Sequence, residues 1–225
     1  MQIRLVVFDL AGTTVRDGGE VVTAFTRALE EHGVAVTPAE LAAVRGSSKR
    51  EAILRFVRNG PDRQERGHLA YRSFRRHLET LYSAGGVAPV PGAEQTFREL
   101  RGRGIRVALN TGFDRDITTR LLSALGWSDR IVDTVVCGDD VKEGRPAPDL
   151  IFAAMQRSGI DAPAQVANVG DTTLDLLAGW RVGVAINIGV TSGAHTRAQL
   201  EAAPHTHVVE SVGDVPSVLT RSLVR

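Results

Sequence analysis

Acidic, hydroxyl and basic side chains follow several apolar runs of the sequence, and their types suit phosphoryl transfer. Asp9 ends L-V-V-F-D, Thr111 follows V-A-L-N, and Arg145 lies in E-G-R-P. Asp171 follows V-A-N-V-G, and Asp175 comes four residues later, on the same face of the expected helix. An aspartate can attack phosphorus to form an aspartyl-phosphate, and carboxylates are ligands that Mg²⁺ prefers. These residues therefore indicate a Mg²⁺-dependent phosphoryl-transfer site.

Hydroxyl groups, turn amides and a cation would hold the phosphoryl group itself. Amides that point toward one spot bind anions, and a basic side chain neutralises charge on the transferring group. Either Arg145 or Lys142 can supply that positive charge. The residues that we expect to bind phosphate are Gly12, Thr13, Thr111, Gly112 and Arg145.

Each of these residues has an ordinary structural explanation when it is taken alone. A strand-terminal aspartate such as Asp9 is often a helix N-cap, and a pair such as Asp171 and Asp175 is often a solvated helix face. Thr111 suits a turn, and Arg145 suits an exposed loop. The functional interpretation depends on their combination, because each group follows its own predicted strand.

Apolar runs and 3.6-residue periodicity predict strands that alternate with helices. Strands are expected at residues 3–8, 105–109, 134–137, 166–169, 182–188 and 207–209, and helices at 93–101, 116–125 and 148–157. This alternation is typical of an α/β protein with a Rossmann-like parallel sheet and helices on both faces. Because ligands bind at the carboxyl ends of such strands, we expect the side chains above to meet at one edge of the sheet.

Residues 17–86 interrupt the alternation, since they have helical patterns and no clear strand. Thr37 followed by Pro38, for example, suits the start of a helix. We therefore expect an all-helical domain inserted after the first strand. The predicted division is a core domain of residues 1–16 and 87–225 and a helical cap domain of residues 17–86.

Composition narrows the classes of protein that fit. The chain has 225 residues with 43% hydrophobic and 24% charged side chains, which is ordinary for a globular protein, and its net charge of +1 argues against nucleic-acid binding. The single cysteine, Cys137, excludes an internal disulfide, and neither a membrane-spanning run nor a signal peptide is visible. We expect a cytoplasmic protein with a small-molecule substrate and no nucleic-acid or membrane partner, and a homodimer is compatible with the sequence.

The motifs V-V-F-D-L-A-G-T-T, A-L-N-T-G, E-G-R-P and N-V-G-D-T-T-L-D resemble those of the haloacid dehalogenase superfamily of phosphotransferases. A helical cap after the first strand also fits that family, so the resemblance spans nearly the whole chain. It implies that Asp9 is the nucleophile, and that Asp9, the backbone carbonyl of Ala11 and Asp171 bind Mg²⁺ with support from Asp175. The groups that it implies for holding the phosphoryl group are Thr111 and Arg145. It further implies a cap that opens and closes about hinges near residues 16–19 and 85–90.

Ala11 is the informative departure, because most phosphatases of the superfamily carry an acid at this position. That acid protonates the leaving group, work worth roughly 10²- to 10⁴-fold in rate. The stretch D-L-A-G-T-T is similar to the phosphonoacetaldehyde hydrolase subgroup, which cleaves a C–P bond through a Schiff base on a cap lysine. The resemblance implies that Lys49, in R-G-S-S-K-R-E, is that lysine, with Arg45 and Arg50 close enough to lower its pKa.

Other positions differ from the subgroup's pattern. Ala52 stands where the subgroup has histidine, Arg45 where it has methionine, and Phe113 where it has tyrosine. Relatives that act on sugar phosphates carry a similar cap motif, in which the basic residue binds a second phosphate. Lys49 therefore has three interpretations: a Schiff-base lysine, an anion-binding residue or a solvated side chain. The leading expectation is hydrolysis of phosphonoacetaldehyde or a close analogue. The alternatives are a P–O phosphatase or phosphomutase relative, and a binding or regulatory relative without catalysis.

Overall fold

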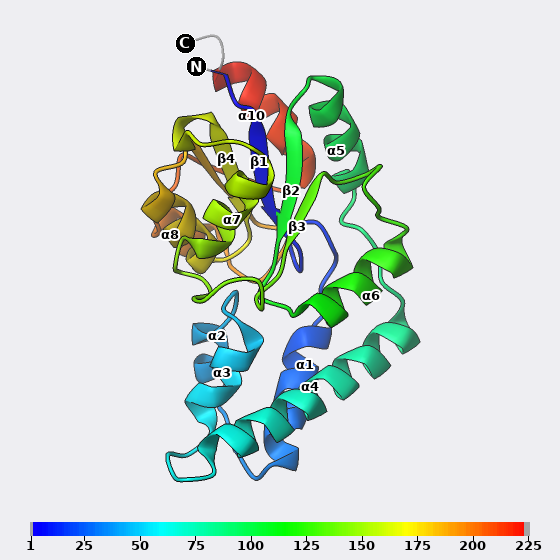
Figure 1. Cartoon of the computed structure of the whole chain (residues 1–225), viewed down its shortest axis with the longest axis vertical. Helices are drawn as coiled ribbons and strands as arrows, with labels where there is room; N and C mark the ends of the chain where they lie inside the picture. Colours follow the sequence, from blue (N-terminus) through cyan, green and yellow to red (C-terminus); the bar gives the residue numbers. More distant parts are fainter. Residues whose placement is uncertain (1, 223–225) are drawn as a thin grey trace.

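A six-stranded parallel sheet with helices on both faces forms the core of the computed structural model, which describes residues 2–222 (Figure 1). The strands are β1 (Leu5–Asp9), β2 (Arg106–Asn110), β3 (Thr134–Val136), β4 (Val166–Gly170), β5 (Ile186–Val190) and β6 (His207–Val209). They are ordered β3-β2-β1-β4-β5-β6. From β1 the chain adds strands toward one edge of the sheet (β2, β3) and then toward the other (β4, β5, β6). In doubly wound sheets, ligands bind at this switch point, here between β1 and β4. The expected Rossmann-like α/β class is confirmed.

The strand expected at residues 182–188 is wrong in its first half. Val182 is the last residue of α8 (Thr173–Val182), and β5 begins only at Ile186. Gly183 ends the helix in the left-handed region, with a φ of 77°, which glycine adopts without steric cost. Val182 is apolar because it packs in the core beneath the sheet. The other expected strands and the three expected helices each overlap an observed element.

Helices cover both faces of the sheet, so alternate residues of a strand enter different apolar clusters. In β1, Val6 and Phe8 point to one cluster, whereas Leu5 and Val7 point to the other. β1 is therefore buried on both faces between β2 and β4, and Asp9 is the residue at its carboxyl end. The helices of the core are α5 (Ala93–Gly102), α6 (Arg115–Leu125), α7 (Asp149–Arg157), α8, α9 (Arg197–Glu201) and α10 (Val215–Ser222), with 3₁₀ turns at Pro163–Gln165 and Val212–Asp214.

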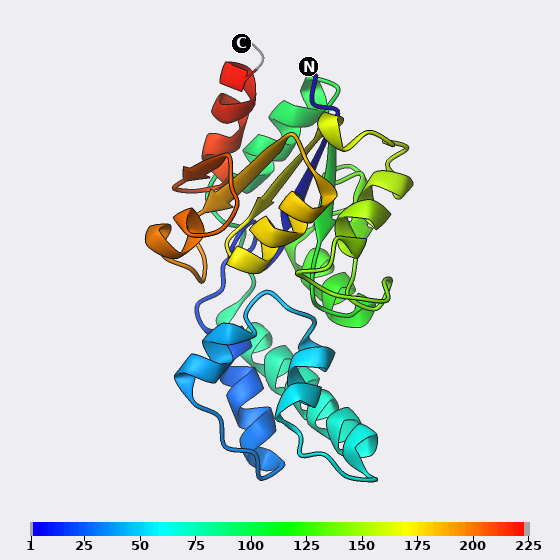
Figure 2. The same cartoon turned by 90° about the vertical axis from the view of Figure 1, so that its left-hand side faces the viewer.

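Four helices between β1 and α5 lie beyond the carboxyl edge of the sheet (Figures 1 and 2). They are α1 (Glu20–Glu31), α2 (Pro38–Ala43), α3 (Lys49–Phe56) and α4 (Arg63–Gly85), and residues 17–86, which contain them, form no strand. We call this segment the helical insertion. Phe25 of α1 packs against Phe74 of α4 with ring centroids 5.9 Å apart. Across residues 2–222, no helix has the length and apolarity of a membrane span.

The chain leaves the core and returns to it along two adjacent segments. The Arg16 N–H donates to the Ala88 carbonyl at 2.9 Å, and the Val90 N–H donates to the Thr14 carbonyl at 2.9 Å. These bonds hold the two connections of the insertion together, and three of the four residues involved belong to the stretches 16–19 and 85–90 where we expect hinges.

Candidate active site

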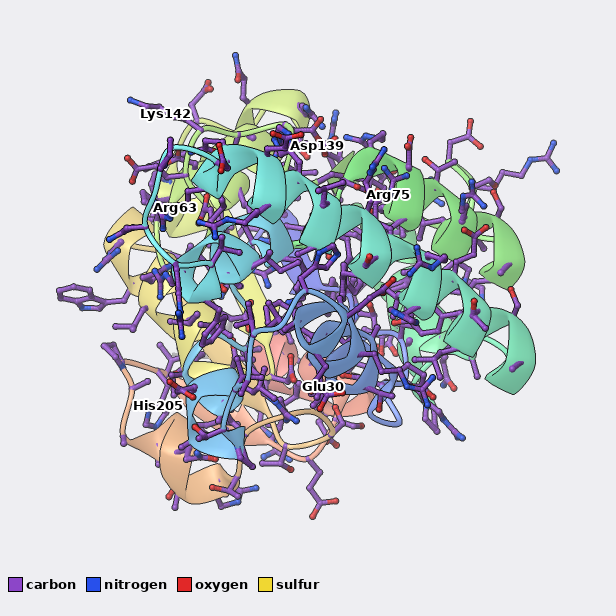
Figure 3. All side chains as sticks on the ribbon, turned by 90° about the horizontal axis from the view of Figure 1, so that it is seen from below. Glu30, Arg63, Arg75, Asp139, Lys142 and His205 are labelled. Atoms are coloured by element: carbon purple, nitrogen blue, oxygen red, sulfur yellow. The ribbon has the colours of Figure 1, made fainter. Side chains whose placement is uncertain are left out.

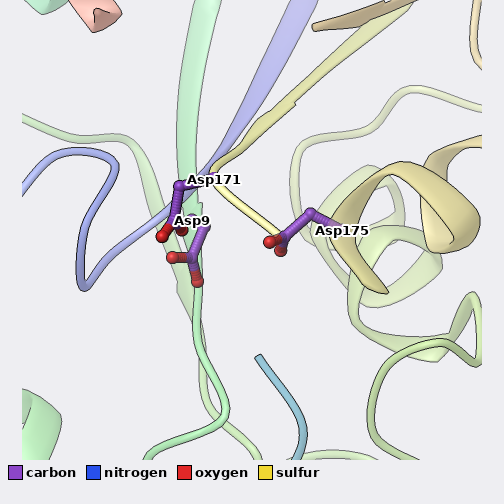
Figure 4. A group of neighbouring side chains, drawn as sticks. All are labelled: Asp9, Asp171 and Asp175. Carbon is purple, nitrogen blue, oxygen red and sulfur yellow. The ribbon is translucent and has the colours of Figure 1, made fainter. Parts of the chain in front are cut away.

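The carboxyl ends of β1 and β4 bring three aspartates together (Figure 4). Asp9 is the last residue of β1, Asp171 follows β4, and Asp175 lies in the first turn of α8. One carboxylate oxygen from each lies within 4.8 Å of the others. All three are buried, with between 2% and 5% of each residue exposed. The predicted meeting of these side chains at one edge of the sheet is therefore observed.

The turn after β1 wraps around Asp171. The Thr13 hydroxyl donates to Asp171 Oδ1 at 3.1 Å, and the backbone N–H of Ala194 donates to Oδ2 at 2.6 Å. Gly12 has a φ of 92°, and a side-chain carbon there would lie 2.5 Å from Asp171 Oδ2, so only glycine fits. Thr13, which we expected to bind phosphate, thus orients Asp171 in this structure.

Asp175 is held by the helix that carries it. Its Oδ2 accepts hydrogen bonds from the Thr172 N–H at 3.0 Å and from the Thr172 hydroxyl at 2.5 Å, and Thr172 in turn caps the first turn of α8. Its Oδ1 lies 2.9 Å from Arg145 Nε, although the N–H does not point along a hydrogen-bonding direction. Both oxygens of Asp175 are therefore engaged by the protein, as both oxygens of Asp171 are.

Arg145 is the cation of this cluster. Its guanidinium is buried, and Nη2 lies 2.7 Å from Asp9 Oδ1 and donates to the Asn110 carbonyl at 3.1 Å. Burial acts to lower the pKa of Arg145, but the carboxylates of Asp175 and Asp9 outweigh burial and raise it. Lys142, the other candidate cation, is exposed at the surface (Figure 3). Of the two, the structure places Arg145 beside the carboxylates.

The carboxylates repel one another in this buried setting. Burial, the charge of Asp9 and the charge of Asp175 raise the pKa of Asp171 well above its usual range. Burial raises the pKa of Asp175 to about 6, with Arg145 opposing the shift and Asp9 adding to it. A hard divalent cation removes this repulsion, and oxygen ligands of this type suit Mg²⁺. The donor set therefore fits Mg²⁺, the metal that the motifs led us to expect.

A small cavity of about 50 Å³ lies between the aspartates and the helical insertion. A water needs roughly 10–15 Å³ on this measure, so the cavity has room for only a few water-sized groups. The core contributes one wall and the insertion the other. The lining residues are Asp9, Ala11, Thr111, Gly112, Phe113, Arg145, Asp171, Thr172 and Ala194 from the core, and Asp17, Val21, Val22, Arg45, Gly46 and Lys49 from the insertion.

Thr111 lies in this wall, buried at the end of β2. Its Oγ1 accepts the Phe113 N–H at 3.2 Å, and its own N–H donates to the Val136 carbonyl at 3.0 Å. Among residues 2–222, the Thr111 hydroxyl donates no hydrogen bond. Its hydrogen is therefore available for an anion in the cavity.

Lys49 enters the same cavity from the insertion. The side chain is half-buried, with Nζ donating to the Ser47 carbonyl at 3.2 Å and lying 5.7 Å from the centre of the Phe113 ring. Burial lowers the pKa of the Lys49 amine, Asp9 opposes this shift, and Arg145 adds to it. The cation beside Lys49 that lowers its pKa is thus Arg145 of the core, whereas the guanidinium of Arg50 pairs with His68 on the exposed side.

Glycines allow the loop before Lys49 to approach the core closely. A side-chain carbon on Gly112 would lie 2.6 Å from the Ser47 carbonyl oxygen. One on Gly46, which has a φ of 83°, would lie 2.5 Å from Thr172 Oγ1. The Lys49 N–H also donates to the Gly112 carbonyl at 3.3 Å. Lys49 therefore lines the same cavity as Asp9 because glycines at positions 46 and 112 let the two segments approach closely.

Several contributors to the site had no expected role. Asn110 accepts from Arg145, Thr172 orients Asp175, and the Ala194 amide binds Asp171. The T-T-L-D pattern is a capping box and was available as a signal for Thr172. Ala194 has no comparable signal, because only the fold brings its loop to Asp171.

Comparison with known proteins identifies the family. A family model described as haloacid dehalogenase-like hydrolase matches residues 3–183. The chain therefore belongs to this family of hydrolases. The match covers the strands that carry Asp9, Thr111 and Asp171, so the resemblance noted from the motifs is confirmed.

Relatives carry two kinds of name. The probable phosphatase IndB of Dickeya dadantii (strain 3937) is 34% identical over 214 residues, covering 94% of this chain and 91% of that protein. A phosphonoacetaldehyde hydrolase of Paraburkholderia phytofirmans is 27% identical over 225 residues, covering 90% of this chain and 82% of that protein. The crystal structure of a hydrolase from Pseudomonas syringae has the same fold, with a TM-score of 0.86 at 24% identity over 97% of this chain and 98% of that one.

Proposed function

We propose that this hydrolase is Mg²⁺-dependent, forms an aspartyl-phosphate at Asp9 and cleaves the C–P bond of a small phosphonate aldehyde, phosphonoacetaldehyde or a close analogue. The observation that carries the proposal is the Lys49 amine, which lines the same 50 Å³ cavity as Asp9 and has a lowered pKa. A lysine that is partly neutral near pH 7 can condense with an aldehyde. In this proposal residues 17–86 are the cap domain over the core.

The proposed reaction uses Lys49 and Asp9 in turn. The Lys49 amine condenses with the aldehyde to form an iminium and releases water. A carboxylate oxygen of Asp9 then attacks phosphorus, the C–P bond breaks, and its electron pair moves to the iminium nitrogen to give an enamine. Protonation of the enamine carbon and addition of water release acetaldehyde and the amine. A further water hydrolyses the aspartyl-phosphate to inorganic phosphate.

Ala11 is consistent with this chemistry. It lines the cavity at the position where most phosphatases of the family have an acid. A methyl group cannot protonate a leaving alkoxide, but a carbon that leaves as an enamine needs no proton as the C–P bond breaks. The missing acid and the buried amine thus support the same reaction.

The choice of lysine at position 49 also supports an amine role. The chain has 27 lysines and arginines, of which only Lys49 and Lys142 are lysines. An arginine binds a phosphate better because its guanidinium donates two parallel hydrogen bonds, but it cannot form an imine. The cavity that faces Asp9 therefore holds the rarer basic residue of this chain.

The remaining roles follow from the positions described above. Asp9, the Ala11 carbonyl and Asp171 would hold Mg²⁺ with support from Asp175, and the ion would neutralise charge on the phosphoryl oxygens. The proposed phosphoryl-binding groups are Thr111, Arg145 and amides of the turns at Gly12–Thr13 and Gly112, although the Gly12 N–H itself donates to the Val15 carbonyl at 2.7 Å. Arg145 also neutralises Asp9 until substrate arrives.

A phosphate-ester hydrolase is the second candidate, and a neighbouring cavity favours it. This cavity has a volume of about 810 Å³, lies between the insertion and the core, and shares Gly112 with the small cavity. It offers room for a leaving group larger than a two-carbon aldehyde. The 34% identical relative is itself named a probable phosphatase.

Turnover of phosphonoacetaldehyde with Mg²⁺, followed as acetaldehyde release, separates the two candidates. We expect Lys49→Arg to lower this turnover by on the order of 10³-fold or more, because it keeps the positive charge and removes the amine. Lys142→Arg is the matched control, since it makes the same substitution at an exposed position. Borohydride reduction with substrate should trap an adduct on Lys49 alone.

Different results would favour the second candidate. Hydrolysis of phosphate esters by a protein that releases no acetaldehyde and traps no adduct would contradict the C–P proposal. Lys49→Arg would then retain most of the esterase activity, as expected of an anion-binding residue.

A further inference from the structure

Polar side chains of α4 in the helical insertion pair with polar side chains of α6 in the core. Figure 1 shows these two helices at the border between the insertion and the core. The contributing residues of α4 are spaced by four, so they share one face of the helix. We call this set the polar seam. Its members are Tyr71, Arg75 and Glu79 on α4, and Asp114, Asp116 and Arg120 on α6 or at its start.

Asp114 is the central acceptor of the seam. The Tyr71 hydroxyl donates to Asp114 Oδ2 at 2.7 Å, and Arg75 Nε lies 3.5 Å from the same oxygen. The Asp114 side chain is only 15% exposed, whereas those of the Glu79–Arg120 pair are 54% and 65% exposed. Exposed ion pairs contribute little, so the Tyr71–Asp114 bond carries most of the interaction.

Asp114 lines the neighbouring large cavity, and the three residues before it line the small cavity of the candidate active site. It comes directly after Thr111, Gly112 and Phe113, and its Oδ1 accepts the Ile117 N–H at 2.9 Å to cap α6. The same short stretch receives the Lys49 N–H at the Gly112 carbonyl. The insertion therefore contacts residues 111–114 at two points, once beside Lys49 and once at Asp114.

The small cavity requires these contacts to break and re-form. The small cavity, of about 50 Å³, is too small for a phosphorylated substrate, so we expect the wall of the core and the wall of the insertion to separate when substrate binds. The backbone pairs at Arg16–Ala88 and Thr14–Val90 lie within the connections and need not break. The polar seam joins the insertion to the core outside these connections, so separation of the two walls there breaks it.

We propose that the Tyr71–Asp114–Arg75 contact is a latch that holds the insertion against the core, so that Tyr71 and Arg75 act as positioning residues that bring Lys49 to Asp9. This inference rests on the proposed function only for the kinetic part of its test. The position of the Lys49 amine can be measured without any substrate.

Chemical labelling of Lys49 tests the latch directly. The chain has two lysines, and exposed Lys142 serves as an internal reference for an amine reagent such as trinitrobenzenesulfonate. We expect Tyr71→Phe and Arg75→Gln each to raise the labelling rate of Lys49 relative to Lys142 by roughly 3- to 10-fold. The first removes the hydrogen bond to Asp114, and the second removes the ion pairs of Arg75 with Asp114 and Asp116. The value of kcat/KM for the preferred substrate should fall by a similar factor.

Arg76→Gln is the matched control. Arg76 is the next residue of α4, but it pairs with Glu31 of α1 inside the insertion, at 2.7 Å. The same substitution there removes an ion pair without touching the core. It should leave both the labelling ratio and kcat/KM unchanged.

The outcomes separate the latch from the proposed substrate. Equal Lys49 labelling in Tyr71→Phe, Arg75→Gln and Arg76→Gln, all folded by circular dichroism, would overturn the latch whatever the substrate is. Faster labelling in the two seam variants, with no protein acting on phosphonoacetaldehyde, would support the latch and contradict the C–P proposal. Asp114→Asn keeps a residue that caps helices well. In the double variant with Tyr71→Phe, the increase in Lys49 labelling should be smaller than the sum of the two separate increases, because both changes act on one hydrogen bond.

Discussion

The two halves of the candidate site are built differently. On the core side, Asp171, Asp175 and Arg145 are each held by two or more hydrogen bonds or ion pairs and are almost completely buried. On the insertion side, Lys49 is half-buried, and among residues 2–222 its amine donates only to the carbonyl of nearby Ser47. One half is fixed by its own fold, and the other takes its place through contacts between two parts of the chain.

This difference matches two requirements of a phosphoryl-transfer enzyme. The nucleophile and the metal ligands must stay in place throughout the reaction, because small displacements cost much of the rate. The group that contacts the rest of the substrate must move aside for entry and exit. The core side chains, which make many hydrogen bonds and ion pairs, suit the first requirement. The Lys49 amine, which makes few, suits the second.

The largest effect that tests this comparison is expected at Asp9. Asp9→Asn removes the nucleophilic oxygen and should lower kcat by roughly 10⁴-fold or more on any substrate, because no other described group can take its role. Steady-state assay of phosphate release measures it. Asp161→Asn, at an exposed aspartate, is the control and should retain full activity. Substantial activity in Asp9→Asn would contradict the assignment of the nucleophile.

A side chain added where the insertion meets the core should have an intermediate effect on activity. Gly112→Ala places a carbon 2.6 Å from the Ser47 carbonyl oxygen, so the insertion cannot reach its closed position. We expect kcat/KM to fall by roughly 10- to 100-fold, comparable to the loss from a misplacement of about 1 Å. The melting temperature should change little, because the core half is untouched.

Gly102→Ala is the matched control, because no atom lies within 4 Å of the added carbon at that position. Equal kinetics for the two variants would show that closure does not depend on the Gly112–Ser47 approach.

The smallest effect concerns stability of the core half as a function of pH. The pKa of Asp175 is raised to about 6, and that of Asp171 is raised as well, above the value of about 3.9 typical of an unfolded chain. The folded, metal-free protein therefore binds more protons than the unfolded chain, and this contribution to stability is lost as pH rises through about 6. We expect Mg²⁺ to raise the melting temperature by several degrees at pH 7.5 and by much less at pH 4.5.

Differential scanning fluorimetry with and without Mg²⁺ measures this dependence. Asp171→Asn should remove most of the Mg²⁺ effect at pH 7.5, whereas Asp161→Asn should not. An equal Mg²⁺ shift at both pH values would show that the ion does not bind at these carboxylates.

The sequence was sufficient for the strands and for the core half of the site. Buried parallel strands are continuous apolar runs, and the chemistry of such sheets gathers where those runs end, so Asp9, Thr111 and Asp171 could be read directly. The error at Val182 has the same origin, because a buried helix end and a strand are both apolar over a few residues. Gly183 was the available signal for the boundary.

By itself, the sequence therefore determined which chemical groups form the candidate site and which predicted strand each of them follows. Only the tertiary structure decided which of these groups lie close together. It places Arg145 rather than Lys142 beside Asp9, and the Thr13 hydroxyl against Asp171. It also brings Lys49 to the cavity through the close approach of Gly112 and Ser47. Periodicity reports which face of an element is buried, but contacts between segments far apart in the chain depend on packing, which no local pattern encodes.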